Sequence, residues 1–115
     1  MAESKSLRIA YGEALAELGA ENDKIVVLDA DLSNATMTNR FSAVYPDRFF
    51  DVGIAEETAV ALASGIAANG GKPVYGVYST FVQRTFDQIA QDLCINNSPA
   101  TIVTFWGSVY GMNDV

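Results

Sequence analysis

The chain contains no histidine and a single cysteine among its 115 residues. The absence of histidine excludes histidine-based catalytic triads, histidine metal ligands and histidine general bases within this chain. A lone thiol, Cys94, excludes an internal disulfide and fits a reducing compartment such as the cytosol. Because Cys94 falls in an apolar helical pattern with no partner base in view, we expect an inert core residue and not a catalytic thiol.

Basic residues are also scarce, with 7 Lys and Arg against 14 Asp and Glu, so the formal net charge is -7. This balance argues against nucleic acid and anionic membrane surfaces as partners, although a local basic pocket remains compatible with it. No apolar run approaches the roughly 20 residues that span a bilayer. The first ten residues, MAESKSLRIA, lack the apolar core of a signal peptide. We therefore expect a cytoplasmic protein.

The residues that are present indicate one globular α/β domain over residues 1–115, since half of them are hydrophobic and only 18% are charged. Short apolar runs predict strands at Ile25–Leu28, Phe49–Val52, Val74–Tyr78 and Thr101–Phe105. Helical periodicity predicts helices at Leu7–Leu18, Thr36–Tyr45, Glu56–Asn69 and Ser79–Asn96. Strands that alternate with helices predict a parallel sheet with flanking helices.

Several details of these helices are also predicted. In the first helix, Ser6 is a candidate N-cap and Gly19 a candidate terminator. Its expected buried face contains Leu7, Ala10, Tyr11, Ala14, Leu15 and Leu18. The expected inward residues of the second are Phe41, Val44 and Tyr45, and those of the long last helix, capped by Ser79 or Thr80, are Val82, Phe86, Ile89 and Leu93.

Two features suggest surfaces that need covering. The small residues of the Glu56–Asn69 helix allow close approach of another backbone, either its own sheet or a partner chain. The last strand is followed only by Trp106–Val115, where an α/β unit normally continues into a covering helix. We therefore expect an incomplete sheet, a chain that forms only part of an enzyme, and a homo-oligomer.

The stretch Asp51–Glu57, DVGIAEE, is the candidate functional centre. It is typical of a strand end, a glycine turn and a carboxylate at a helix start, and so lies at the sheet edge where open α/β folds bind ligands. Glu56 is the candidate working residue. The alternative, which position alone favours, is a solvated or capping acid that the helix macrodipole favours in the first turn, and Glu57 is interpreted in that way.

Two further groups of residues follow strands. Asp29 and Asp31 end one strand, and each can bind a ligand or cap the turn at Ser33–Asn34, the turn being the favoured interpretation.

Near the start of the last helix, Tyr78, Phe81 and Arg84 offer aromatic rings and a cation that suit a planar ring and a phosphate. The alternatives are core packing for Phe81 and a surface charge for Arg84. The chain contains neither of the common glycine-rich phosphate loops and no cluster with metal-ligand spacing.

The motifs VGIAE, ASGIAANG, STF and FDQI occur in one order. In this order they resemble the pyrimidine-binding domain of the transketolase family of thiamine-diphosphate enzymes. The resemblance runs from about Ser6 to Asp114. DADLSNAT is similar to a loop of transketolases, including split transketolases made of two chains. The spacing from Glu56 to Phe81 and the YSTFVQR element are closer to 1-deoxyxylulose-5-phosphate synthases, and the β subunits of 2-oxoacid dehydrogenase E1 enzymes match more distantly.

The resemblance implies roles for four cofactor-binding residues. Glu56 matches the family glutamate that hydrogen-bonds N1′ of the aminopyrimidine, where a shielded carboxyl that donates a proton favours the imino tautomer. Phe81 matches the aromatic residue that stacks on the pyrimidine ring. Asp31 matches a transketolase aspartate near the cofactor, and Ile54 lies in the turn that lines the pyrimidine pocket.

Tyr78 and Arg84 match positions that help hold the substrate phosphate in the synthase branch. The chain departs from that branch at Phe105-Trp106, where the synthases have Asp-Arg, and at Asn113, which is acidic there. In the family a separate domain with a GDG motif holds the diphosphate and Mg²⁺. This chain contains no GDG, so the resemblance implies that such a partner domain or subunit completes the cofactor site.

The expected function is therefore the pyrimidine-binding part of a thiamine-diphosphate-dependent, transketolase-like enzyme. Such an enzyme transfers a two-carbon ketol unit between sugar phosphates, and the isolated chain is expected to be inactive. Two alternatives stay open: a 1-deoxyxylulose-5-phosphate synthase-like fragment, and a non-catalytic assembly or binding module in which Glu56 is incidental.

Overall fold

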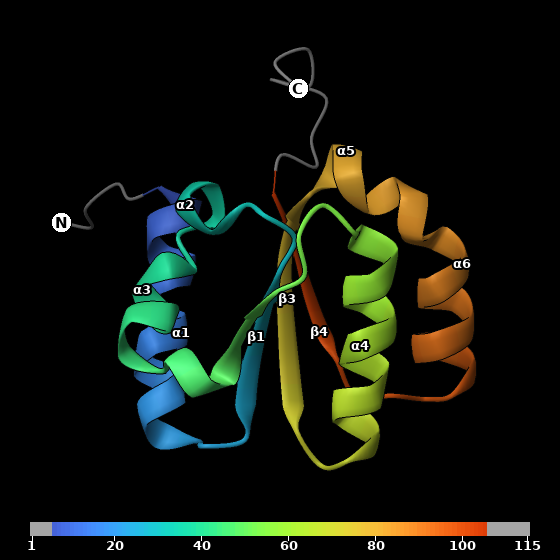
Figure 1. Cartoon of the computed structure of the whole chain (residues 1–115), viewed down its shortest axis with the longest axis horizontal. Helices are drawn as coiled ribbons and strands as arrows, with labels where there is room; N and C mark the ends of the chain where they lie inside the picture. The colour runs from blue at the N-terminus through green and yellow to red at the C-terminus, as the bar shows by residue number, and fades with distance from the viewer. Residues whose placement is uncertain (1–5, 106–115) are drawn as a thin grey trace, which may run out of the picture.

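In the computed structural model, which describes residues 6–105, a parallel sheet forms the centre of the molecule (Figure 1). The described strands are β1 (Ile25–Asp29), β2 (Phe49–Asp51), β3 (Lys72–Tyr78) and β4 (Thr101–Phe105), in the order β2-β1-β3-β4. Every neighbouring pair is parallel. A parallel sheet with flanking helices confirms the α/β prediction. Because the strands are parallel, their carboxyl ends meet at one edge, and the loops that follow them gather at the top of Figure 1.

One face of the sheet is covered by α1 (Leu7–Glu21), α2 (Ser33–Thr36) and α3 (Asn39–Val44), which is followed by the 3₁₀ turn η1 (Pro46–Arg48) (Figure 1). The buried residues of this layer are Leu15, Ile25, Val27 and Phe41.

The predictions for this first layer were wrong in detail. Gly19 does not end α1, which continues to Glu21. Gly19 is instead a close-contact residue, because a Cβ there would lie 2.7 Å from the Phe41 ring. The buried residues of α1 are Gly12, Leu15 and Gly19, whereas Leu7, Ala14 and Leu18 of the predicted face are exposed. Ser6 does occupy the N-cap position, but its side chain makes no capping hydrogen bond.

The predicted single helix Thr36–Tyr45 is divided into α2 and α3 by Met37, which adopts a left-handed conformation with φ of 66°. Thr36 is therefore the buried end of α2 and not the start of a longer helix. Phe41 is inward, as predicted, and Tyr45 packs on it with ring centroids 5.2 Å apart. Val44, however, is exposed.

The opposite face of the sheet is covered by α4 (Glu56–Ala68) and by the segment that follows β3 (Figure 1). Ala59 and Ala63 of α4 are buried in the core of this layer with Leu28, Tyr75 and Val77. The small residues of α4 thus allow close approach to its own sheet.

The predicted long helix over Ser79–Asn96 is a series of short segments. These are α5 (Ser79–Val82), the 3₁₀ turn η2 (Gln83–Thr85), α6 (Phe86–Gln88) and the π-helix η3 (Ile89–Ile95), and Tyr78 holds the N-cap position. Leu93 is buried as predicted, but Phe86 is 76% exposed, and Cys94 is exposed where a core position was expected. Phe86 follows the 3₁₀ turn η2, so the regular helical period that predicted it inward does not apply there.

The expectation of an uncovered sheet depends in part on Trp106–Val115, which lies outside the described residues. Among the residues that are described, an apolar groove lies on the α1 side of β3 and β4, lined in part by Tyr11, Leu18, Val74 and Val103. No helix between residues 6 and 105 is both long and apolar enough to cross a bilayer.

Candidate functional site

A small cavity of about 170 Å³ lies at the carboxyl edge of the sheet. The loops after β1, β2 and β3 supply its lining, which consists of Ala30, Asp31, Leu32, Ile54, Glu56, Phe81 and Arg84. Five of these residues are candidates from the sequence, so the structure brings Asp31, Ile54, Glu56, Phe81 and Arg84 together. Leu32 was missed, because an apolar residue just after a strand carries no chemical signal of its own.

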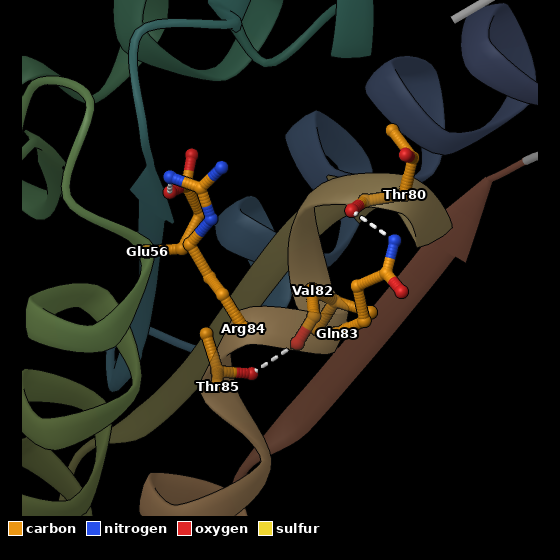
Figure 2. A network of polar contacts seen from close by, with 6 residues as sticks. All are labelled: Glu56, Thr80, Val82, Gln83, Arg84 and Thr85. Atoms are coloured by element: carbon orange, nitrogen blue, oxygen red, sulfur yellow. Dashed lines mark hydrogen bonds and ion pairs between the residues drawn. The ribbon is translucent and has the colours of Figure 1, made fainter.

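Glu56 is the first residue of α4, and its side chain is only 4% exposed. The Oε1 atom lies 3.2 Å from Nη1 of Arg84 (Figure 2). That contact is an ion pair without hydrogen-bond alignment, and Oε1 is buried with no hydrogen-bond partner among residues 6–105. Glu56 is therefore not a solvated acid, although it does lie in the first turn of α4, where the macrodipole favours a carboxylate, and Glu57 is exposed, as predicted. A buried carboxylate oxygen with an unmet hydrogen bond is costly, and a donor from a ligand in the cavity would satisfy it.

Arg84 reaches Glu56 because the chain around it is bent. Gln83 Nε2 donates to the Thr80 carbonyl at 2.7 Å, and Thr85 Oγ1 donates to the Val82 carbonyl at 2.6 Å (Figure 2). These side-chain bonds compete with the regular helical pattern, and the 3₁₀ turn η2 forms there. The Arg84 side chain is 53% exposed, so it forms the solvent-facing rim of the cavity and leaves Glu56 shielded.

Asp29 and Asp31 have different surroundings. Asp29 is fully buried and accepts hydrogen bonds from the Leu32 N–H, from Thr36 Oγ1 at 2.7 Å and from Thr38 Oγ1 at 2.9 Å. Burial raises the pKa of Asp29 above its usual value, these hydrogen bonds oppose the rise, and the charge of Asp51 adds to it. Asp29 thus bonds within the segment after β1, as the turn interpretation expects, although its partners lie on either side of Ser33–Asn34 and do not include these two residues.

Asp31 instead lines the cavity, in a left-handed conformation with φ of 61°. Its backbone N–H donates to Oδ1 of Asp51 at 2.9 Å. The same oxygen accepts the Gly53 N–H, also at 2.9 Å. Asp51 was not predicted as a site residue, although it begins the DVGIAEE stretch. Its position at the end of a strand, two residues before a glycine turn, was the sequence signal that could have identified it.

The aromatic residues form a connected group beside the cavity. Tyr78 stacks on Phe81 with ring centroids 6.4 Å apart and meets Phe105 edge-on at 6.1 Å. Phe81 lines the cavity, whereas Tyr78 does not. A phosphate-binding role for Tyr78 and Arg84 stays a prediction, and Trp106 and Asn113, which mark the departures from the synthase pattern, lie outside the described residues.

The cavity thus combines a shielded carboxylate, one aromatic ring, apolar walls and a cation at the rim. Such a lining suits a flat heteroaromatic ring with a nitrogen that shares a proton with the Glu56 carboxyl group. No group of three or more His, Cys, Asp or Glu side chains within residues 6–105 is arranged to hold a metal ion.

Comparisons with known proteins show which family the chain resembles. The chain is 51% identical over 102 residues to 1-deoxy-D-xylulose-5-phosphate synthase of Clostridium beijerinckii and 46% identical over 101 residues to synthase 1 of Geobacter sulfurreducens. These matches cover 89% and 88% of this chain but 16% of each relative. The chain therefore spans about a sixth of the length of the curated relatives it matches.

Among solved structures, the chain resembles one described as "Split gene transketolase, inactive beta4 tetramer". The two are 44% identical with a TM-score of 0.75, and the match covers 83% of this chain and 32% of that one. The family model "Transketolase, pyrimidine binding domain" matches residues 3–113. Because this match spans nearly all of the 115 residues, the chain belongs to the transketolase pyrimidine-binding domain family.

Proposed function

We propose that this chain binds the aminopyrimidine ring of thiamine diphosphate and is the pyrimidine-binding part of a transketolase-like transferase. The observation that carries the proposal is the buried Glu56 Oε1, which lacks a hydrogen-bond partner in a cavity also lined by Phe81. An aminopyrimidine fits these residues because it offers a flat π face and a ring nitrogen that shares a proton with a carboxyl group.

Each lining residue then has a physical task. Glu56 holds a proton at ring nitrogen N1′, and its burial keeps water from competing for that bond. Phe81 packs against the ring face and Leu32 forms an apolar wall, while Ile54, which is 76% exposed in this structure, offers apolar surface that a bound ring would cover. Asp31 supplies a polar group at the opening. When bound, the cofactor itself supplies the carbon nucleophile and the electron sink for ketol transfer between sugar phosphates.

A separate diphosphate-binding domain or subunit, which also holds Mg²⁺, is the second part of the proposal. The support is that the described lining contains one cation, Arg84, which cannot by itself balance the charge of a diphosphate and its Mg²⁺ site. On this proposal the isolated chain has no activity. Exposed Leu62, Phe86 and Ile95 provide apolar surface for a homo-oligomer or for the partner. The lone cysteine supports a cytoplasmic location.

A 1-deoxyxylulose-5-phosphate synthase-like activity is the second candidate, and the identity to synthases over most of this chain favours it. In that case Arg84, which is half exposed at the rim, is the candidate group for the substrate phosphate. Formation of 1-deoxyxylulose 5-phosphate by the reconstituted enzyme, without ketol transfer from a ketose donor, would favour this candidate.

Reconstitution with a chain that carries the diphosphate-binding domain tests the main proposal. Glu56→Gln keeps the shape of the side chain but removes the acid, and turnover should fall about 10²–10⁴-fold. Glu57→Gln is the matched control, since it removes the same charge from the exposed neighbouring residue and should leave turnover nearly unchanged. Equal turnover by wild type and Glu56→Gln would contradict the proposal and favour a non-catalytic module.

A further inference from the structure

Two separate turns that line the cavity depend on left-handed residues. The turn after β1 contains Asp31, with φ of 61°, and the turn after β2 contains Gly53, with φ of 78°. The first turn presents Leu32 to the cavity, and the second presents Ile54. The left-handed conformation is unfavourable for a residue with a Cβ, so Asp31 in particular needs a compensating contact.

One side-chain oxygen supplies this contact for Asp31 and a matching contact for Gly53. The N–H groups of Asp31 and Gly53 both donate to Oδ1 of Asp51, each at 2.9 Å. Asp51 can reach both turns because it ends β2 directly opposite Asp29, the last residue of β1. A further bond, from the Val52 N–H to the Asp29 carbonyl at 2.9 Å, holds the two strand ends together at the same level.

We propose that Asp51 is a positioning residue that fixes the two cavity walls relative to each other. A carboxylate oxygen accepts two N–H donors without strain, and its charge strengthens both bonds. Asp51 acts on the cavity through the backbone, because it does not itself line it. This inference concerns the shape of the cavity and does not depend on the ligand that the cavity takes.

Asp29 provides the contrast that defines this role. Within residues 6–105 its carboxylate accepts hydrogen bonds from the segment after β1 alone, from Leu32, Thr36 and Thr38, so it shapes one wall. Asp51 accepts one bond from a residue 20 positions before it and one from a residue two positions after it. Loss of the Asp51 acceptor should therefore loosen both turns while the buried Asp29 network remains in place.

Amide hydrogen exchange, followed residue by residue by NMR on the full chain without ligand, tests the proposal. In Asp51→Ala the Asp31 and Gly53 amides should exchange about tenfold faster, the expected effect of losing one hydrogen bond. Core amides of β1 and β3 should keep their exchange rates, because only the turns are loosened.

The conservative variant Asp51→Asn shows whether the two turns are held by the hydrogen-bond acceptor of Asp51 or by its negative charge. Its side-chain oxygen can still accept both N–H groups, so exchange at Asp31 and Gly53 should stay within about threefold of wild type. Asp23→Ala removes one negative charge from the turn before β1, at the opposite edge of the sheet, and should change neither amide.

The proposal is overturned if Asp51→Ala leaves both amides unchanged, if Asp51→Asn accelerates them as much as Asp51→Ala, or if all amides accelerate together. The exchange experiment uses the chain without ligand, so its result does not depend on whether the cofactor assignment is correct. If the exchange experiment contradicts the role of Asp51, the cofactor assignment is still tested separately by reconstitution.

Discussion

Replacing Arg84 by methionine removes the cation that faces the Glu56 carboxylate but keeps much of the side-chain stem. At the observed 3.2 Å, Coulomb's law gives about 1 kcal/mol in water and about 5 kcal/mol at an effective dielectric constant of 20. Exposed ion pairs are worth about 0–1 kcal/mol, whereas breaking a buried pair costs about 3–5 kcal/mol. Since Arg84 is 53% exposed and Glu56 only 4%, we expect Arg84→Met to lower the free energy of unfolding by about 1–2 kcal/mol.

A double-mutant cycle in urea isolates this interaction. In a Glu56→Gln background the carboxylate charge is absent, so Arg84→Met should cost only a few tenths of a kcal/mol, and the coupling energy should be about 1–2 kcal/mol. Arg40 and Glu13 form a matched control pair, also at 3.2 Å but with side chains 42% and 39% exposed. Their coupling should be below about 0.5 kcal/mol. A coupling between Arg84 and Glu56 no larger than that of the control would refute the shielded ion pair.

Three further predictions concern the fold. Burial raises the pKa of Asp29 above 3.8, so its contribution to stability is largest below about pH 4 and declines as the pH rises through the folded-state pKa. In urea unfolding measured at a series of pH values, the free energy of unfolding of wild type minus that of Asp29→Asn should fall as the pH rises. A difference that grows with pH would contradict a raised pKa for Asp29. Gly19→Ala should destabilise by about 1–3 kcal/mol because its Cβ would meet Phe41, whereas Gly65→Ala, in open space on α4, should stabilise by about 0.5–1 kcal/mol. Cys94 is exposed, so it should react with a thiol reagent in the native chain about as fast as in the unfolded chain, and strong protection would contradict its position.

The sheet and its order of elements were predictable from the sequence because buried parallel strands require uninterrupted apolar runs. Ile25–Asp29 shows this directly, since its apolar run is almost entirely buried and the observed strand matches the expected one to within one residue. Thr101–Phe105 also has the expected bounds, although it contains two threonines and lies at the edge of the sheet. The approximate site was also predictable, because parallel strands bring their following loops to one edge. Glu56 and Phe81 could therefore be expected near each other despite the 25 positions between them.

What could not be predicted depends on side chains that bond to the backbone at a distance in sequence or against the helical pattern. The break between Ser79 and Ile95 follows from the bonds of Gln83 and Thr85 to preceding carbonyls, which apolar periodicity does not reveal. Periodicity consequently placed Phe86 inside, although it is exposed. The two hydrogen bonds that Asp51 accepts from Asp31 and Gly53 were missed for a similar reason, because they join two turns that are adjacent only in the folded chain.

The central claim is that an aminopyrimidine ring binds between Phe81 and Ile54 and is held by Glu56. Intermolecular nuclear Overhauser effects between millimolar thiamine and the isotope-labelled chain test it most directly. The account predicts contacts from the pyrimidine methyl group and ring proton to Phe81 and Ile54, which are lost in Glu56→Gln and retained in Glu57→Gln. Contacts that persist unchanged in Glu56→Gln, or that appear instead at Val74 and Val103 in the groove beside α1, would contradict it.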